Sequence, residues 1–362
     1  GLSRRRLRYR PGILAAMPPN VAVVGATGAV GTEMLRILAE RAFPLASLRL
    51  IATARSAGRK ISYEGEELTV AEISDRALEG IDVALFDTPD EAAIEWIPKA
   101  RASGAICIDN SAAWRMDDEV PLIIPEINAG AIDRHRGIVA NPNCTAVTLL
   151  MPLAPLHRAA GCIRVIASSY QSVSGAGVAG VEDLYEQTEK LLPERDAVRR
   201  GRIEGSVPPG RAFAHPIAFN VIPHVGSFDP AGTTSEERRV AGETRKILDA
   251  PIEVFSTCVR VPTVAGHGVA AWAEFARPID ADEARALLSA ADGVTLDDDP
   301  KASRYPTILS AAGGDKAVVG RVRSDPDHAV AVAFFSTCDN LRKGAALNAV
   351  QIAELLVARG LI

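Results

Sequence analysis

The chain contains no run of about 18 or more consecutive apolar residues, so its sequence predicts no membrane-spanning helix. Aromatic residues make up only 5% of its 362 residues, and no internal repeat or low-complexity tract is present. The formal net charge of −5 lacks the excess of positive charge that is typical of nucleic-acid-binding proteins. We therefore expect neither a membrane nor a nucleic acid as a partner. With 48% hydrophobic residues, the chain is instead able to bury a large core.

Cysteine is also scarce. The chain has five cysteines, an odd number, and no C-x-x-C pair, which argues against a disulfide framework. Free thiols favour a reducing compartment, and we expect a cytoplasmic protein. Four of the five lie in or beside apolar, strand-like runs and are predicted to be core residues: Cys107, Cys162, Cys258 and Cys338.

The first ten residues carry five arginines and no acidic residue. Such an arm is compatible with an RNA-binding or targeting tail, but no apolar stretch of signal-peptide length follows it. We therefore expect residues 1–17 to form a disordered extension or the remnant of an upstream leader.

The first 140 residues alternate apolar strands with helical segments. Strands are predicted at 20–24, 48–53, 81–86 and 105–109, with a helix over 91–102 between the last two. This alternation is typical of a doubly wound parallel sheet, and a chain of this length has room for a second domain. We predict an α/β fold with a Rossmann-like dinucleotide-binding domain.

The strand at 20–24 runs directly into a glycine-rich turn and a helix that extends to about Glu40. Gly25, Gly28 and Gly31 allow a dinucleotide pyrophosphate to approach the backbone and the helix N-terminus closely. The same pattern also occurs where a strand and a helix simply pack tightly. The context favours dinucleotide binding.

The second strand ends in Ala54-Arg55-Ser56, at the place where NAD-binding folds often carry an acidic residue for the ribose 2′-hydroxyl. Arg55 and Ser56 provide a cation and a hydroxyl instead. This favours the 2′-phosphate of NADP, the alternative being that Arg55 is an ordinary surface residue.

After residue 144 the strands become longer and the helices between them fewer. Strands are predicted at 163–171, 252–262, 268–277, 316–322 and 329–338, which indicates an α+β domain with a mixed sheet. The segment 192–211, rich in Arg, Glu, Pro and Gly, is predicted to be a loop. A strong helix is expected at 341–359.

Cys144 stands in the run Asn141-Pro142-Asn143-Cys144, where a turn is followed at once by an apolar helical pattern. A thiol at a helix N-terminus meets free N–H groups and the positive end of the helix dipole, which favour thiolate over thiol. Cys144 is therefore a candidate nucleophile that needs no metal ion. Taken alone, it could equally be a buried structural cysteine.

Three more residues could complete such a site. Arg260 lies at the end of a predicted strand, on the face opposite Phe255, and could clamp a carboxylate. His267 lies between two glycines in what looks like an exposed loop, as a general acid or base requires. Gln171, which ends the strand at 163–171, could orient or polarise a carbonyl group. Each of the three could instead have a purely structural role.

Seven motifs in order along the chain together resemble bacterial aspartate-β-semialdehyde dehydrogenase, and the resemblance covers the chain from about residue 20 onward. The motifs are G-A-T-G-A-V-G at 25–31, A-R-S-A-G at 54–58, D-N-S at 109–111 with Arg115, N-P-N-C at 141–144, Y-Q-S-V-S-G-A-G at 170–177, T-C-V-R-V-P at 257–262 with G-H at 266–267, and D-N-L-R-K-G-A-A-L-N-A-V-Q-I-A-E-L-L at 339–356.

The resemblance implies a reversible, NADP-dependent reductive dephosphorylation of L-4-aspartyl phosphate to L-aspartate 4-semialdehyde and phosphate, on the branch to lysine, methionine and threonine. It also implies that the helix at 341–359 packs back on the first domain, so that the expected domains are 18–143 with 341–362, and 144–340. It further implies a homodimer or homotetramer formed through the second domain. In the implied mechanism, Cys144 is the nucleophile and forms a thioester with the substrate, and His267 is the general acid and base.

The resemblance further assigns Gln171 as the orienting group, Arg260 as the clamp for the substrate α-carboxylate and Glu236 as the acid that holds the α-amino group. Arg115 matches a phosphate-binding arginine, and Arg239 stands where the family usually has a lysine for phosphate. The implied NADP contacts are Gly25, Thr27, Gly28, Ala29, Val30, Arg55, Ser56, Ser174, Gly175 and Asn340. No metal site is implied.

The chain departs from the family pattern in the loop at 87–91. The family's small Gly/Ser-rich loop is here Asp87-Thr88-Pro89-Asp90-Glu91, which brings three acids near the expected cofactor site.

Two other kinds of enzyme use the same cofactor fold, a nucleophilic thiolate and an acyl phosphate. They are N-acetyl-γ-glutamyl-phosphate reductase and a glyceraldehyde-3-phosphate dehydrogenase-like enzyme. Arg260 and Glu236 favour a free amino-acid head group, which neither rival substrate offers. A non-catalytic, NADP-binding paralogue is the alternative from a different class.

Overall fold

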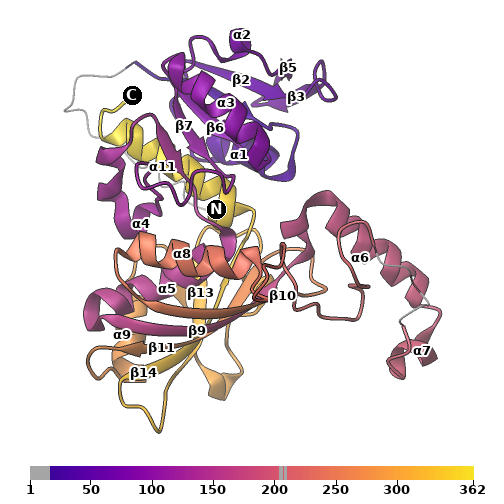
Figure 1. The fold of residues 1–362 in the computed structure, drawn as a ribbon, viewed down its shortest axis with the longest axis vertical. Helices are drawn as coiled ribbons and strands as arrows, with labels where there is room; N and C mark the ends of the chain where they lie inside the picture. Colours follow the sequence, from indigo (N-terminus) through magenta and orange to yellow (C-terminus); the bar gives the residue numbers. More distant parts are fainter. Residues whose placement is uncertain (1–16, 204–206, 208–209) are drawn as a thin grey trace, which may run out of the picture.

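The structure is a computed structural model that describes residues 17–203, 207 and 210–362. It consists of two sheet-based domains stacked one on the other, with a helical arm that projects from the second domain (Figure 1). The expectation for residues 1–17 concerns almost entirely residues outside this described part. Among the described residues, no helix is both long enough and apolar enough to cross a membrane.

The first sheet is wholly parallel and has the strand order β5-β2-β1-β6-β7-β8. Its strands are β1 (Asn20–Val24), β2 (Ser47–Ala52), β5 (Ala71–Glu72), β6 (Val83–Phe86), β7 (Ile106–Asp109) and β8 (Ile138–Ala140). The chain order reverses at β1, and doubly wound sheets bind dinucleotides beside such a switch point. The predicted Rossmann-like fold is confirmed.

Both faces of the first sheet are buried, which explains its nearly continuous apolar strands. One face, with Val21 and Val23 of β1, packs against α1 (Ala29–Glu40) and α11 (Leu347–Ala358). The other face, with Ala22 and Val24, packs against α2 (Asp75–Leu78) and α3 (Asp90–Ala102). The remaining elements of this half are the hairpin β3 (Lys60–Tyr63) and β4 (Glu66–Thr69), and α4 (Pro125–Asn128) with a 3-10 turn at Ala129–Arg134.

The second sheet is mixed, with the order β10-β9-β11-β14-β13-β12. Its strands are β9 (Cys162–Gln171), β10 (Glu253–Arg260), β11 (His267–Phe275), β12 (Val294–Leu296), β13 (Ala317–Ser324) and β14 (Ala331–Cys338). The β9/β10 and β12/β13 pairs are parallel, whereas β11 and β14 run antiparallel to their neighbours. The predicted mixed sheet is therefore confirmed.

One face of the second sheet is covered by α5 (Cys144–Ala160), α8 (Ser235–Leu248) and α9 (Ala281–Ser289). The other face is open and partly apolar, with Ile166 49%, Tyr170 37% and Phe255 71% exposed. All four cysteines predicted to be core residues are buried. Short helices at Pro300–Ala302 and Ile308–Ala311 (α10) complete this half.

The arm consists of a 3-10 turn at Val173–Ala176, α6 (Gly177–Leu191) and α7 (Arg195–Arg199). It has a small apolar cluster of its own, in which Leu184 and Leu191 pack with Ile217. The segment 192–211 was predicted to be a loop, but α7 lies within its described part, and residues 204–206 and 208–209 fall outside the described residues.

Candidate active site

Cys144 is the first residue of α5, as the Asn-Pro-Asn turn predicts. The side chain of Asn143 caps this helix by accepting hydrogen bonds from the N–H groups of Thr145 and Ala146, at 2.8 and 3.2 Å. A π-helical turn at Arg342–Ala346 passes beside the thiol, and a Cβ added to Gly344 would stand 2.8 Å from the Cβ of Cys144. Only glycine at position 344 leaves this space free.

Both domains contribute to a cavity of about 340 Å³ around Cys144. All the residues predicted to be catalytic or to bind substrate line this cavity: Cys144, Gln171, His267, Arg260, Glu236, Arg115 and Arg239. They come from segments up to 152 residues apart, since Arg115 precedes His267 by that distance (267 minus 115). Their convergence defines the candidate active site.

The charge state of Cys144 differs from the expectation. Burial raises the pKa of its thiol to about 12, and the carboxylate of Glu236 acts in the same direction. Arg260 and Arg115 lower that pKa, but by less. The thiol is therefore protonated at neutral pH, and its position at the helix N-terminus does not make it a thiolate. A base is needed to take its proton.

His267 was predicted to lie in an exposed loop. In the structure it is instead the first residue of β11 and is fully buried. It pairs with Gln171 on one side and with Cys338 on the other, so the sheet encloses it. Burial, and next the charge of Arg260, lower its pKa to about 3, and the imidazole is therefore neutral.

The two ring nitrogens of His267 have different surroundings. Nδ1 lies 3.1 Å from both the Ser172 N–H nitrogen and the Gly266 carbonyl oxygen, and 3.2 Å from the Ser172 hydroxyl. Nε2 is buried without a hydrogen-bond partner among the described residues. The Ser172 N–H donates to Nδ1 in the tautomer that carries its proton on Nε2, whereas the tautomer with the proton on Nδ1 donates to the Gly266 carbonyl. Only the second tautomer leaves Nε2 able to accept a proton.

Glu236 is buried in the cavity wall and is held by three donors. Its carboxylate accepts from Asn143 Nδ2 at 3.1 Å, Thr145 Oγ1 at 3.2 Å and Gln171 Nε2 at 3.1 Å. The amide of Gln171 also donates to Ser169 Oγ at 3.1 Å. Both amide N–H bonds of Gln171 are thus in use, so in this arrangement its side chain orients Glu236.

The sequence did not indicate Glu243, which holds two parts of the site in place. This buried carboxylate accepts from the Asn143 N–H at 2.6 Å and from Arg115 Nη1 at 3.1 Å. Burial raises its pKa, whereas Arg115 and the Asn143 N–H lower it. Its spacing from Glu236, seven residues or two helical turns along α8, was the available signal, because such residues share one helix face.

The cationic side chains differ in how much of their hydrogen-bonding capacity is already used. Arg115 donates to the Asn141 and Asn110 carbonyls at 2.9 and 2.6 Å in addition to Glu243. Arg260 donates from Nη1 to the Ser172 carbonyl at 2.7 Å, whereas its buried Nε has no partner among the described residues. Arg239 is 37% exposed and lies 3.9 Å from Asp90 and from Glu236.

The loop that carries Arg115 is fixed from behind by Lys246 of α8. Lys246 Nζ donates to the carbonyls of Arg115, Asp117 and Val120 at 2.7, 2.6 and 2.9 Å.

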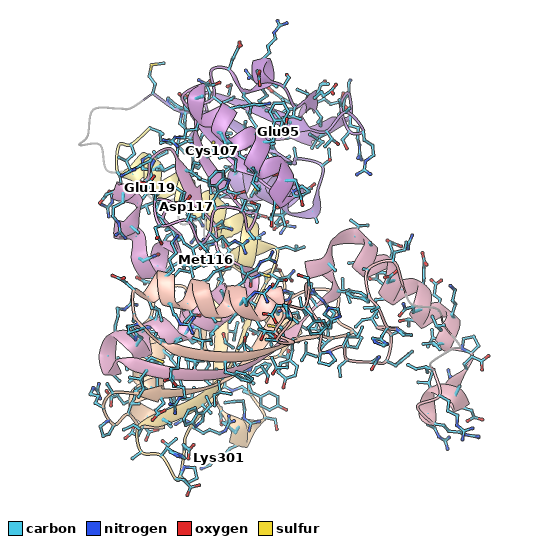
Figure 2. The ribbon with its side chains drawn as sticks, viewed as in Figure 1. Glu95, Cys107, Met116, Asp117, Glu119 and Lys301 are labelled. Atoms are coloured by element: carbon cyan, nitrogen blue, oxygen red, sulfur yellow. The ribbon has the colours of Figure 1, made fainter. Side chains whose placement is uncertain are left out.

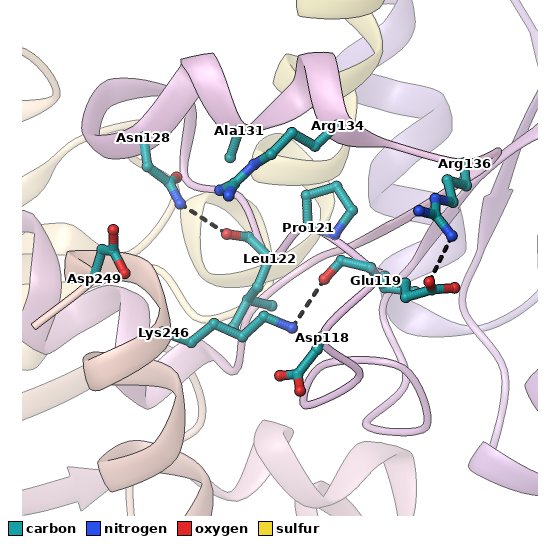
Figure 3. Close-up of a pocket in the computed structure, with 11 residues that line it drawn as sticks. Asp118, Glu119, Pro121, Leu122, Asn128, Ala131, Arg134, Arg136, Lys246 and Asp249 are labelled. Atoms are coloured by element: carbon teal, nitrogen blue, oxygen red, sulfur yellow. Dashed lines mark hydrogen bonds and ion pairs between the residues drawn. The ribbon is translucent and has the colours of Figure 1, made fainter. Parts of the chain in front are cut away.

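Lys246 also lines a second cavity, of about 680 Å³, between α8 and the segment 118–136 (Figure 3). The predicted site residues do not line this cavity. Met116 and Asp117 lie at this junction of the two domains (Figure 2). Lys246 therefore ties the loop that carries Arg115 to the second domain.

The predicted dinucleotide turn requires its glycines. A Cβ on Gly25 would lie 2.0 Å from the Asp87 carbonyl oxygen, and one on Gly31 would lie 2.3 Å from the Gly25 carbonyl oxygen. Gly25 also has φ +94°, a conformation that favours glycine. The N-cap residue of α1, Gly28, has no side chain to cap the N–H groups of the first turn, and a helix N-terminus can offer such groups to an anion.

The residues predicted to contact the cofactor fall into two groups in space. The first lies at the carboxyl ends of β1 and β2, where Thr27 Oγ1 donates to Ser56 Oγ at 3.2 Å and Arg55 is exposed. The second lies at the candidate active site. There, Asn340 Oδ1 accepts from the Gly266 N–H at 2.9 Å, and its Nδ2 donates to Ser174 Oγ at 3.0 Å.

Gly175 belongs to the second group. A Cβ at this position would stand 2.7 Å from Arg260 Nη1 and 3.2 Å from the imidazole of His267. The glycine therefore allows the backbone to lie directly over the two side chains.

Fold and site together define a two-domain dehydrogenase of the semialdehyde dehydrogenase type, and comparison with known proteins supports this. Residues 20–135 match the family described as semialdehyde dehydrogenase, NAD binding domain, and residues 153–343 match semialdehyde dehydrogenase, dimerisation domain. A nicotinamide dinucleotide is therefore the cofactor class, and the second domain is of a type that forms oligomers.

Relatives that match over nearly their whole length identify the family more narrowly. It is 46% identical over 343 residues to the aspartate-semialdehyde dehydrogenase of Streptomyces akiyoshiensis, covering 94% of this chain and 98% of that protein. It is 42% identical over 351 residues to that of Bacillus subtilis (strain 168), with 95% and 99% coverage. The crystal structure of aspartate semialdehyde dehydrogenase II complexed with ASA from Vibrio cholerae matches with a TM-score of 0.88 and 41% identity, covering 95% and 99%. The chain belongs to the aspartate-semialdehyde dehydrogenase family.

Proposed function

We propose that this enzyme catalyses the NADP-dependent, reversible reductive dephosphorylation of L-4-aspartyl phosphate to L-aspartate 4-semialdehyde and phosphate, in the biosynthesis of lysine, methionine and threonine. The observation that carries the proposal is the convergence of Cys144 and His267 with Arg260 and Glu236 in one cavity of about 340 Å³. A nucleophile with its base lies there beside opposite charges suited to an amino-acid head group.

The carboxylate and amino group of the substrate account for two of the charged side chains. Arg260 has a free, buried Nε and binds the α-carboxylate, and Glu236 binds the α-ammonium group. Arg115 and Arg239 bind the phosphate. This arrangement places the acyl carbon near Cys144, and the binding energy is used for orientation.

The thiol of Cys144 then attacks the acyl carbon. His267 accepts the thiol proton at Nε2, the Sγ–C bond forms, and the C–O bond to phosphate breaks. The product is a thioester on Cys144. A reduced nicotinamide held at the dinucleotide site would supply the hydride that converts the thioester to a thiohemiacetal. His267 gives its proton to the oxygen of this thiohemiacetal. When the Sγ–C bond breaks, the hydroxyl proton passes back through His267 to Sγ, so that the aldehyde is released and the Cys144 thiol is regenerated.

The residues at the first sheet fit a dinucleotide, and Arg55 supports the 2′-phosphorylated form. Gly25 and Gly31 leave no room for side chains, and Gly28 leads into the start of α1, whose N–H groups suit an anion. Thr27, Ala29 and Val30 complete the turn. Arg55 is exposed beside Ser56, and no acid occupies their place. Ser174, Gly175 and Asn340 would lie at the nicotinamide end.

We further propose a homodimer or homotetramer, built on the open apolar face of the second sheet around Ile166 and Phe255. The five free cysteines support a reducing compartment, and we assign the enzyme to the cytoplasm.

The test is to run the reaction in reverse with L-aspartate 4-semialdehyde, NADP and phosphate, and to follow NADPH absorbance. We expect turnover that requires phosphate, prefers NADP to NAD and is lost in Cys144→Ala. A folded wild-type protein that binds NADP but does not turn over would contradict the proposal and would favour the non-catalytic paralogue.

A further inference from the structure

The acidic loop after β6 places one carboxyl group directly on the dinucleotide turn. The Asp87 N–H donates to the Val24 carbonyl at 2.8 Å, which fixes the loop against the end of β1. The Asp87 carbonyl oxygen lies so close to Gly25 that a Cβ there would stand 2.0 Å away. The position of Asp87 is thus determined by the backbone.

The Asp87 side chain extends toward the start of α1. Its Oδ2 lies 3.4 Å from the position that a Cβ of Gly28 would occupy, and the nearby Gly31 N–H lowers the pKa of the carboxyl group. Asp87 therefore approaches the N-terminus of α1, where Gly28 provides no side-chain cap. An anionic ligand at this helix N-terminus would share the same N–H groups with the carboxylate.

The charges around Asp87 do not compensate its own. The glycine-rich turn at 25–30 contains no ionisable side chain. Asp109, at the end of β7, adds negative charge, and Asn110 provides only a long contact of 3.5 Å from its Nδ2. At the start of α3, Asp90 accepts from the Ala112 N–H and lies 3.9 Å from Arg239, and Glu91 is exposed. Burial, the largest cause, raises the pKa of Asp87 to about 6.

We propose that Asp87 sets the affinity of this enzyme for its dinucleotide, and that the dinucleotide binds in preference to the form in which the Asp87 carboxyl group is protonated. The inference rests on the proposed dinucleotide site. A pyrophosphate placed at the same helix N-terminus adds negative charge next to the carboxylate, which favours uptake of a proton. A protonated Asp87 also gains an O–H donor that it can offer to a phosphate oxygen.

Linkage fixes the sign of the effect. If binding favours protonated Asp87, the Kd for the dinucleotide rises as the pH increases above about 6, by up to about tenfold per pH unit. Phosphate groups also titrate near pH 6, so the informative quantity is the difference between variants.

The experiment is isothermal titration calorimetry of NADP and of NAD binding at pH 7.5, in two buffers with different ionisation enthalpies. The dependence of the heat on the buffer gives the number of protons taken up. We expect the wild type to take up a substantial fraction of one proton more than Asp87→Asn, and Asp87→Asn to bind more tightly at pH 8. Asparagine keeps an oxygen near the Gly31 N–H, and a thermal melt verifies the fold.

Glu91→Gln is the matched control, because it removes one negative charge from the same loop at an exposed position. It should take up as many protons as the wild type. Equal proton uptake by the wild type and Asp87→Asn would overturn the proposal and leave Asp87 with a structural role at the N-terminus of α1 only. Absence of any dinucleotide binding by the folded wild type would instead count against the proposed cofactor, so the two failures are distinguishable.

Discussion

The cavity around Cys144 and the glycine-rich turn differ in the groups that they present, and we propose that each binds an anion with those groups. The cavity presents charged side chains. Arg115, Glu236 and Glu243 are buried and connected by hydrogen bonds to partners from both domains. The turn instead presents backbone groups, because Gly25 and Gly31 leave no space for side chains. We infer that substitutions in the cavity lower kcat and leave the Kd for the dinucleotide unchanged. Substitutions in the turn should instead raise the Kd for the dinucleotide.

The largest effect is expected for Cys144→Ser. Loss of the thiol should reduce kcat by about 10⁴-fold or more, because a buried hydroxyl is a far weaker nucleophile. The Kd for NADP, measured by calorimetry, should not change. A change in both quantities would show that cavity and turn are not separable.

Glu243→Gln tests the side-chain network of the cavity. The substitution leaves Arg115 without its buried counter-ion, and we expect the free energy of unfolding to fall by about 3 kcal/mol. Urea denaturation measures this loss. Glu67→Gln is a suitable control, since its ion pair with Lys60 lies on the exposed β3/β4 hairpin. Similar losses in the two variants would contradict the assigned role.

The raised pKa of Cys144 predicts how its alkylation depends on pH. With a pKa of about 12, the thiolate fraction should rise about tenfold per pH unit, or about 100-fold between pH 7 and 9. The rate of iodoacetamide labelling at Cys144, followed by mass spectrometry, should show this slope. A plateau near pH 7 would mean that the helix N-terminus and the arginines outweigh burial.

Gly31→Ala tests the turn. The added Cβ would collide with the Gly25 carbonyl, so we expect a cost of about 1–3 kcal/mol, seen as a roughly 10- to 100-fold higher Kd for the dinucleotide. Gly130→Ala, where a Cβ meets nothing within 4 Å, is the matched control and should bind normally. Chemistry from enzyme saturated with NADP should be little affected.

The smallest effect is expected for Arg55→Ala. Removal of an exposed cation should weaken NADP binding by about tenfold and leave NAD binding unchanged. Arg59→Ala, also exposed and four residues further along, is the control. Equal losses for both cofactors would remove the basis for NADP preference.

Much of this architecture was predictable because the signals are local. The apolar strands and the glycine turn followed from short patterns, and so did the start of α5 after Asn143. The turn at Cys144 is specified by three adjacent residues. Resemblance to the family then added Glu236 and Arg115, which no local pattern distinguishes.

The parts that were missed depend on contacts between distant segments. The sequence around His267 looks like an exposed loop, but pairing with Gln171 and Cys338 makes it a buried strand residue. The pKa of Cys144 was misjudged for the same reason, because burial by both domains is not visible at the helix N-terminus. Glu243 escaped notice because its two partners, Asn143 and Arg115, lie 100 and 128 residues away.

The placement of α11 has a consequence for how the chain is synthesised. This helix covers one face of the first sheet, and its Asn348 donates to Asn141, 207 residues earlier in the chain. A nascent chain that has completed β8 therefore has every strand of the parallel sheet and α1, but it lacks the helix that covers the rest of this apolar face. The uncovered part stays exposed while the ribosome makes the entire second domain. The domain that is translated first is thus the last to complete its fold. Until α11 is made, its exposed apolar surface must be kept from aggregating.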